Sequence, residues 1–109
     1  MKVVIIEDEQ PAAQKLTRYL EKYDAKIEVV HYLATVQDAV GWLRANQEQV
    51  DLLFVDIQLQ GSLSFSIFQE IAVHKPIIFI TAYDEYAIDA FKVNSVDYLL
   101  KPVTFTHLS

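Results

Sequence analysis

Cysteine is absent from the 109-residue chain, and glycine and proline are scarce, with two and three residues respectively. Without thiols, the chain can form neither a disulfide framework nor a thiolate metal site. The few turn-forming residues indicate short connections, with no linker or low-complexity tract. The length suits one small domain, and the 52% of hydrophobic residues is enough to form a core.

Long hydrophobic runs are missing as well. No run approaches the ~18 apolar residues that a membrane-spanning helix needs. The amino-terminal stretch MKVVIIEDE is not a secretory signal, because charged residues follow only four apolar ones. We therefore expect a cytoplasmic protein with no membrane partner.

Basic residues are in the minority. The chain has nine lysines and arginines and fifteen aspartates and glutamates, which gives a formal net charge of −6. Such a surface repels phosphate backbones, so the chain alone is a poor nucleic-acid binder, although it could regulate a DNA-binding partner. The acidic excess suits a site that collects a divalent cation.

What the sequence does contain is a series of short apolar runs, at residues 3–6, 27–33, 52–55, 77–80 and 96–100. Most are rich in β-branched or aromatic residues without polar alternation, which is typical of strands buried on both faces of a parallel sheet. Helical signals lie between them: Pro11 in a first turn, Thr35 and Asp84 as N-caps, and Phe65, Phe68 and Ala72 as an apolar stripe.

This alternation predicts an α/β fold, a doubly wound, flavodoxin-like sheet of five parallel strands in the order 2-1-3-4-5. A further helix would follow Pro102, but only residues 103–109 remain. They provide for about two turns, so the last helix is expected to be truncated.

Polar residues end four of the predicted strands: Glu7 and Asp8, then Asp56, Thr81 and Lys101. Ligands of such sheets bind beyond the carboxyl ends of the strands, where strands one and three are neighbours. Alone, each residue has a plainer interpretation, as a solvated strand end or a partner of a helix dipole. Together, carboxylates that share Mg²⁺ beside a lysine and a hydroxyl indicate a phosphoryl-transfer site with a carboxylate nucleophile.

Four stretches, IIEDE, LLFVDIQL, IIFITAYDEYAIDAF and VDYLLKP, carry a family resemblance over nearly the full chain. The sequence resembles the receiver domain of two-component response regulators. It is most similar to the LytR/AlgR type, in which a mostly β DNA-binding domain follows the receiver. The resemblance implies that residues 1–109 form the receiver domain and that DNA is contacted only through an effector domain outside this chain.

The resemblance also implies a role for each matching position. Asp56 would accept a phosphoryl group from a phosphohistidine on a sensor histidine kinase. Asp8, Asp56 and the backbone carbonyl of Gln58 would ligate Mg²⁺, with Glu7 acting directly or through water. Lys101 would pair with the acceptor and then with the phosphoryl group, and the Lys101–Pro102 bond would match the family's frequent cis peptide.

Switching would involve Thr81, whose hydroxyl would bind a phosphoryl oxygen, and Tyr98 at the family's aromatic switch position. Phosphorylation adds about −1.5 to −2 charge, and the resulting movement would promote a homodimer. The face expected to change comprises Tyr86, Asp89, Lys92, Val93 and Asp97. Gln58 and Tyr83 would flank the path of the hydrolytic water and tune the lifetime of the phosphoryl group.

The sequence departs from the family pattern in three places. Glu7 occupies a position where many receivers carry Asp. In the loop after Asp56, Gln60 replaces a proline, and Ser64 or Phe65 stands where a second glycine is expected. The stretch between Asp8 and Asp56 is slightly long, and we expect the extra length in the second predicted helix or at its exit, near residues 46–49.

Three other functions compete with a phosphorylated switch. A receiver that only dimerises would lack the acceptor, the acid pair or the lysine, and none is missing. A phosphatase with an aspartyl nucleophile usually needs an acid two residues later, where Gln58 cannot donate a proton. A flavin-binding protein would want a hydroxyl-rich phosphate loop after strand one, where Glu7 to Glu9 would repel phosphate.

Overall fold

The computed structural model describes the backbone of residues 1–81 and 97–100 and the side chains of residues 1–80. The helix predicted after Asp84 and the truncated last helix after Pro102 lie outside the described residues. Among the described residues, no helix has both the length and the apolar character needed to cross a bilayer.

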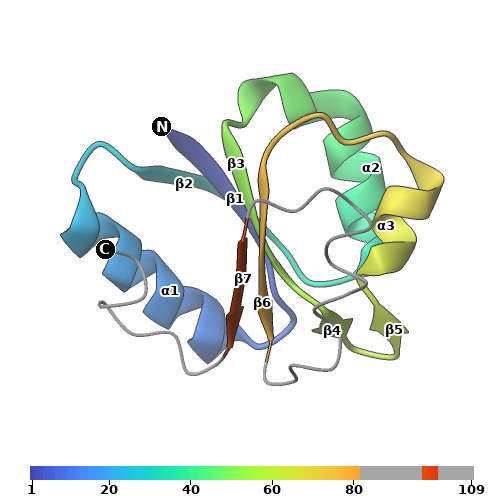
Figure 1. Cartoon of the computed structure of the whole chain (residues 1–109), viewed down its shortest axis with the longest axis horizontal. Coiled ribbons are helices and arrows are strands. Elements are labelled where there is room, and N and C mark those ends of the chain that lie inside the picture. The colour runs from blue at the N-terminus through green and yellow to red at the C-terminus, as the bar shows by residue number, and fades with distance from the viewer. Residues whose placement is uncertain (82–96, 101–109) are drawn as a thin grey trace.

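A five-stranded parallel sheet forms the centre of the molecule (Figure 1). Its order is β2-β1-β3-β6-β7, so the first strand lies between the second and the third. The predicted fold class and strand order are confirmed, with β6 and β7 as the fourth and fifth strands of the sheet. The strands are β1 (Lys2–Ile6), β2 (Glu28–Leu33), β3 (Leu52–Asp56), β6 (Ile77–Thr81) and β7 (Asp97–Leu100).

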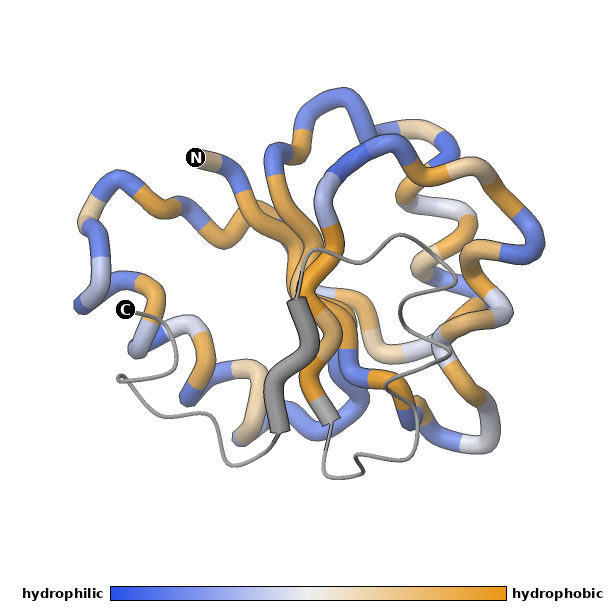
Figure 2. The backbone as a smooth tube through the Cα atoms, in the orientation of Figure 1, coloured by the Kyte–Doolittle hydropathy of each residue, from blue (hydrophilic) through white to orange (hydrophobic). Residues whose placement is uncertain are grey.

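Helices cover both faces of this sheet, α1 (Gln10–Tyr23) on one side and α2 (Val36–Asn46) with α3 (Phe65–Glu70) on the other (Figure 1). Successive strand residues serve opposite faces, since Val3 and Ile5 pack with α1 whereas Val4 and Ile6 pack with α2 and α3. Figure 2 shows the resulting apolar strands between helices of mixed polarity.

The first two helices begin where the sequence predicts. Pro11 lies in the first turn of α1, where its missing N–H costs no hydrogen bond. The hydroxyl of Thr35 accepts a hydrogen bond from the backbone N–H of Asp38 at 3.1 Å and so caps α2.

The third helix is shorter than the predicted stripe. Phe65 and Phe68 lie on α3, edge to face with Phe79 at ring-centroid distances of 5.3 and 5.8 Å. Ala72 is exposed and lies outside the helix, so its place in the stripe was wrong. The backbone turns to an extended conformation at Ile71, and the segment that follows makes other contacts.

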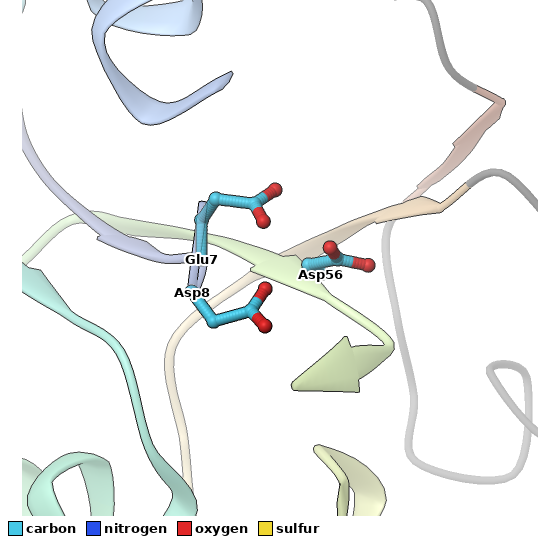
Figure 3. A group of neighbouring side chains, drawn as sticks. All are labelled: Glu7, Asp8 and Asp56. Atoms are coloured by element: carbon cyan, nitrogen blue, oxygen red, sulfur yellow. The ribbon is translucent and has the colours of Figure 1, made fainter. Parts of the chain in front are cut away.

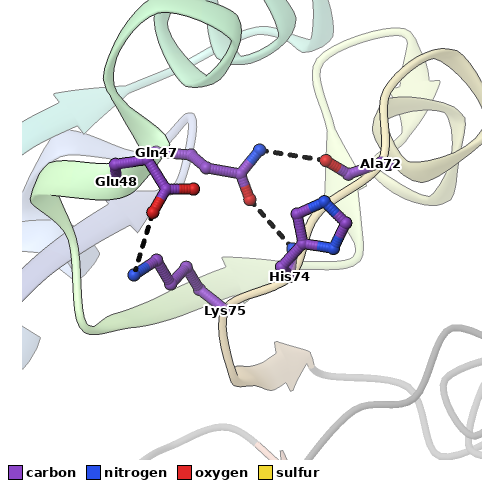
Figure 4. Close-up of polar contacts among 5 residues, drawn as sticks. All are labelled: Gln47, Glu48, Ala72, His74 and Lys75. Atoms are coloured by element: carbon purple, nitrogen blue, oxygen red, sulfur yellow. Dashed lines mark hydrogen bonds and ion pairs between the residues drawn. The ribbon is translucent and has the colours of Figure 1, made fainter.

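Those contacts come from Gln47, in a 3₁₀ turn (Gln47–Gln49) that follows α2 (Figure 4). The side-chain amide of Gln47 donates to the carbonyl of Ala72 and accepts from the N–H of His74, both at 2.9 Å. Beside it, Lys75 and Glu48 form an ion pair at 3.8 Å. Gln47 therefore takes the place of helical hydrogen bonds in holding the chain that leads into β6.

We expect Gln47→Ala to lower the free energy of unfolding by about 1–2 kcal/mol, because two side-chain hydrogen bonds to backbone are lost. Glu48→Gln serves as the control, since its carboxylate is 82% exposed and its ion pair contributes about 0–1 kcal/mol. Urea unfolding followed by circular dichroism measures both. Equal effects of the two substitutions would contradict the role assigned to Gln47.

The loop after Asp56 forms an element that the sequence analysis did not predict, an antiparallel hairpin of β4 (Gln58–Leu59) and β5 (Ser62–Leu63). Gln58 lies opposite Leu63, and Leu59 opposite Ser62. Gly61 has a φ of +76°, in the left-handed region that glycine adopts most readily.

Candidate metal and phosphoryl-transfer site

Three carboxylates meet at the carboxyl edge of the sheet (Figure 3). Glu7 and Asp8 follow β1, and Asp56 is the last residue of β3. Each of the three residues has one carboxylate oxygen that lies within 4.8 Å of a carboxylate oxygen of the other two. Asp56 is only 7% exposed, whereas Glu7 and Asp8 are half-buried. The structure thus brings together the three acids that the sequence analysis selected.

The register of the parallel strands explains this meeting. Ile6 pairs with Val55, and both are fully buried, so the residues that follow each reach the same edge. The N–H of Glu7 donates to the carbonyl of Leu33 at 2.9 Å, which also ties the end of β1 to β2.

Backbone N–H groups orient two of the carboxylates. Oδ1 of Asp56 accepts a hydrogen bond from the N–H of Gln58 at 3.2 Å. Oε1 of Glu7 accepts one from the N–H of Glu9, also at 3.2 Å. Each bond joins a carboxylate to the N–H two residues later, so it fixes how that carboxylate lies relative to the backbone that follows it.

The β4–β5 hairpin directs a further oxygen to this edge. The N–H of Ser64 donates to the carbonyl of Ile57 at 2.7 Å, so Ile57 and Ser64 face each other through a ladder hydrogen bond. Such bonds alternate along an antiparallel pair, so both backbone polar groups of Gln58 are directed away from β5. One of them, the N–H, reaches Asp56, and the carbonyl is therefore directed to the same side of the strand.

This donor set fits a magnesium ion. Hard cations such as Mg²⁺ prefer oxygen ligands, and Mg²⁺ usually takes one or two carboxylates and keeps several waters. Two unit charges about 4 Å apart repel by about 1 kcal/mol in water and more at a partly buried site. The cluster therefore gains stability from a shared cation.

The neighbouring strand brings the next predicted residue to the same edge. Asp56 pairs with Ile80, so Thr81 follows directly at the end of β6, where its backbone pairs with Leu100. Tyr98 pairs with Phe79 within the sheet. The side chains of Thr81 and Tyr98 lie outside the described residues.

The remaining predicted site residues are not covered by the described structure. Asp97 is described only as a backbone position in β7. The other predictions that lie outside the described residues concern Lys101, Pro102, Tyr83, Tyr86, Asp89, Lys92 and Val93.

A cleft of about 430 Å³ opens beside Glu7 and Asp8, between α1 and the end of β2. Sequence reasoning missed its wall at Tyr32, whose hydroxyl lies 2.6 Å from that of Thr17 on α1. The other residues lining the cleft are Gln10, Ala13, Gln14, Leu33 and Ala34.

The β4–β5 hairpin was missed as well. A glycine between short apolar segments, as at Leu59-Gln60-Gly61-Ser62, is a recognisable hairpin signal.

Comparison with known proteins assigns the chain to a family. A family model described as "Response regulator receiver domain" matches residues 3–109. The chain belongs to this family. The resemblance inferred from the four sequence stretches is therefore confirmed.

Curated receiver proteins are similar over most of the chain. It is 37% identical over 105 residues to the sensory transduction protein LytT of Bacillus anthracis. It is 39% identical over 105 residues to the transcriptional regulatory protein YpdB of Escherichia coli K12. These matches cover 94% of this chain but 42% of each relative, so the chain spans less than half of their length. The match to LytT bears out the expected likeness to the LytR/AlgR type.

Solved receiver structures superpose closely. The response regulatory domain of protein mrkE from Klebsiella pneumoniae matches with a TM-score of 0.86 at 32% identity, over 99% of this chain and 88% of that one. CheY of Borrelia burgdorferi, solved in complex with CheX, matches with a TM-score of 0.85 over 99% of this chain and 83% of that one. Its identity is 17%, so this second likeness concerns the fold alone.

We expect Asp8→Asn to raise the free energy of unfolding of the metal-free protein by about 1–3 kcal/mol, because one of three mutually repelling charges is removed. We also expect MgCl₂ to stabilise the unsubstituted protein and Asp8→Asn to abolish most of that effect. Thermal unfolding in EDTA and in MgCl₂ measures both effects.

Glu9→Gln is the matched control for Asp8→Asn, since it removes one negative charge from an exposed residue adjacent in sequence and outside the cluster. It should leave the magnesium effect unchanged. If the two variants gained stability equally, net charge rather than the carboxylate cluster would be the cause.

Proposed function

We propose that this receiver domain accepts a phosphoryl group on Asp56 from the phosphohistidine of a sensor histidine kinase, with Mg²⁺ as cofactor. The observation that carries the proposal is the meeting of Glu7, Asp8 and Asp56 at the ends of two adjacent strands, in a chain of the receiver family. Glu7, Asp8, Asp56 and the Gln58 carbonyl would hold the ion, which when bound neutralises charge on the transferring phosphoryl group.

The chain's own residues prepare the acceptor. Burial and the N–H of Gln58 fix the orientation of the Asp56 carboxylate before the donor arrives. A carboxylate oxygen attacks phosphorus and forms an acyl phosphate bond. The bond from phosphorus to the histidine nitrogen breaks, and its electron pair stays on the imidazole. Lys101 would pair with the added charge, and the Thr81 hydroxyl would donate to a phosphoryl oxygen.

The output of this reaction is a change of surface rather than turnover of a substrate. Thr81 and Tyr98 form the expected switch, and the face from Tyr86 to Asp97 is where a phosphorylated homodimer would assemble. An effector domain outside residues 1–109 would contact DNA and control transcription in the cytoplasm. This part of the proposal is supported by the greater length of the relatives and by the name of YpdB.

A small phosphodonor with Mg²⁺ tests the acceptor directly. We expect intact-protein mass spectrometry to show a gain of one phosphoryl group, dependent on Mg²⁺ and absent from Asp56→Asn. Asp51→Asn is the matched control, since this exposed acid precedes the same strand at its opposite end, where it accepts the N–H of Lys2 at 2.7 Å. It should be phosphorylated normally.

Two results would count against the proposal. A phosphoryl group retained in Asp56→Asn would place the acceptor elsewhere. No gain of mass in the unsubstituted protein would favour a receiver that acts only as a dimerisation module. Rapid turnover of a phosphate monoester would instead indicate a phosphatase, although Gln58 offers no general acid two residues after Asp56.

Tyr83, two residues after Thr81, is expected to hinder the hydrolytic water. Tyr83→Ala should therefore shorten the half-life of the phosphoryl group several-fold, as followed by mass spectrometry after the donor is removed. A half-life that stays equal or lengthens would refute this role. Tyr19→Ala, on α1, is the control and should leave the half-life unchanged.

A further inference from the structure

The β4–β5 hairpin begins only two residues after the acceptor and is firmly attached to the core. Ile57 is fully buried and Leu59 is 4% exposed, and both belong to the cluster under α2 and α3. Ser64, where the hairpin ends, is also fully buried. The base and the inner side of the hairpin are therefore fixed, while Gln58, Gln60 and Ser62 face solvent.

The two backbone groups of Gln58 depend on this hairpin. Its N–H donates to Oδ1 of Asp56, and its carbonyl is directed to the same side by the ladder alternation. That alternation persists only while Leu59 stays opposite Ser62 and Ile57 opposite Ser64. A change of register would turn the Gln58 peptide away from the acceptor.

The register depends in turn on a two-residue turn, Gln60–Gly61. Gly61 has a φ of +76°, which residues with a side chain rarely adopt. A Cβ built on Gly61 would meet no atom within 4 Å. A substitution at this position therefore acts through backbone conformation and not through a steric clash.

We propose that the β4–β5 hairpin positions the metal site, with Gly61 as the positioning residue that keeps the Gln58 peptide directed at Asp56. This inference rests on the proposed function, because it assumes that the acidic cluster binds Mg²⁺. It adds that affinity for the ion is set partly by a turn whose side chains do not touch it.

Three substitutions separate backbone conformation from other effects. Gly61→Ala disfavours the left-handed conformation, Gly61→Asn tolerates it better, and Gly41→Ala changes an exposed glycine of α2 where a Cβ also meets no atom within 4 Å. The probe is Mg²⁺ alone, titrated by isothermal calorimetry. Amide NMR of the metal-free protein adds a second readout at Gln58, and thermal unfolding checks that each variant is folded.

We expect Gly61→Ala to weaken Mg²⁺ binding about three- to tenfold, because apparent affinity falls with the population of the binding-competent conformer. The Gln58 amide signal of the metal-free protein should shift or broaden in the same variant. Gly61→Asn should stay within about twofold of the unsubstituted protein, and Gly41→Ala should not differ from it.

If Gly61→Ala fails to fold, one glycine inserted after Gly61 provides a second variant, since it alters the turn that sets the register without requiring a strained residue. It should weaken Mg²⁺ binding to a similar extent.

Unchanged affinity and an unchanged Gln58 amide in the folded variant would overturn the inference and leave the proposed function intact. Equal weakening by Gly61→Ala and Gly61→Asn would overturn it too. Absence of Mg²⁺ binding in the unsubstituted protein would instead overturn the metal site itself.

Discussion

The parallel pairing of β1 with β3 is the constraint on which the site depends. Ile6 and Val55 are opposite each other and fully buried, so a slip of one residue would turn apolar side chains out of the core. The same slip would separate Asp8 from Asp56. Three mutually repelling carboxylates are therefore held together by the burial of apolar side chains behind them, which contributes more free energy than the repulsion costs.

The features that the sequence predicted well are those whose signal is local. Apolar runs end immediately before Glu7, Asp56 and Thr81, so the strands and the edge at which these residues gather follow from short segments. The N-cap at Thr35 is equally local, because its hydroxyl bonds to a residue three positions later. The α/β class followed from the alternation of strands and helices.

The features that the sequence predicted poorly depend on contacts between residues that are distant in the chain. Helical periodicity extended the third helix to Ala72, but the carbonyl of Ala72 is bonded by Gln47, a residue 25 positions away. No sequence pattern near residue 72 reveals that the side chain of Gln47 bonds this carbonyl in place of a helical hydrogen bond. The hairpin after Asp56 was missed because its strands have two residues each, too few for periodicity to be visible. Gly61 signals a turn, but the sequence does not show which residues pair across it, because that depends on the burial of Ile57 and Ser64.

The orientation of Gln58 has a consequence for how such a protein can diverge. Gln58 serves the site through its backbone N–H and carbonyl, and its side chain is exposed. Any residue that keeps the hairpin register presents the same two backbone groups, so positions 60 and 62 are open to sequence drift. A substitution at position 58 would change the lifetime of the phosphoryl group and not the direction of these backbone groups. The exposed side chains of the hairpin can thus change, and with them the partner that the domain binds, while the acceptor Asp56 is preserved.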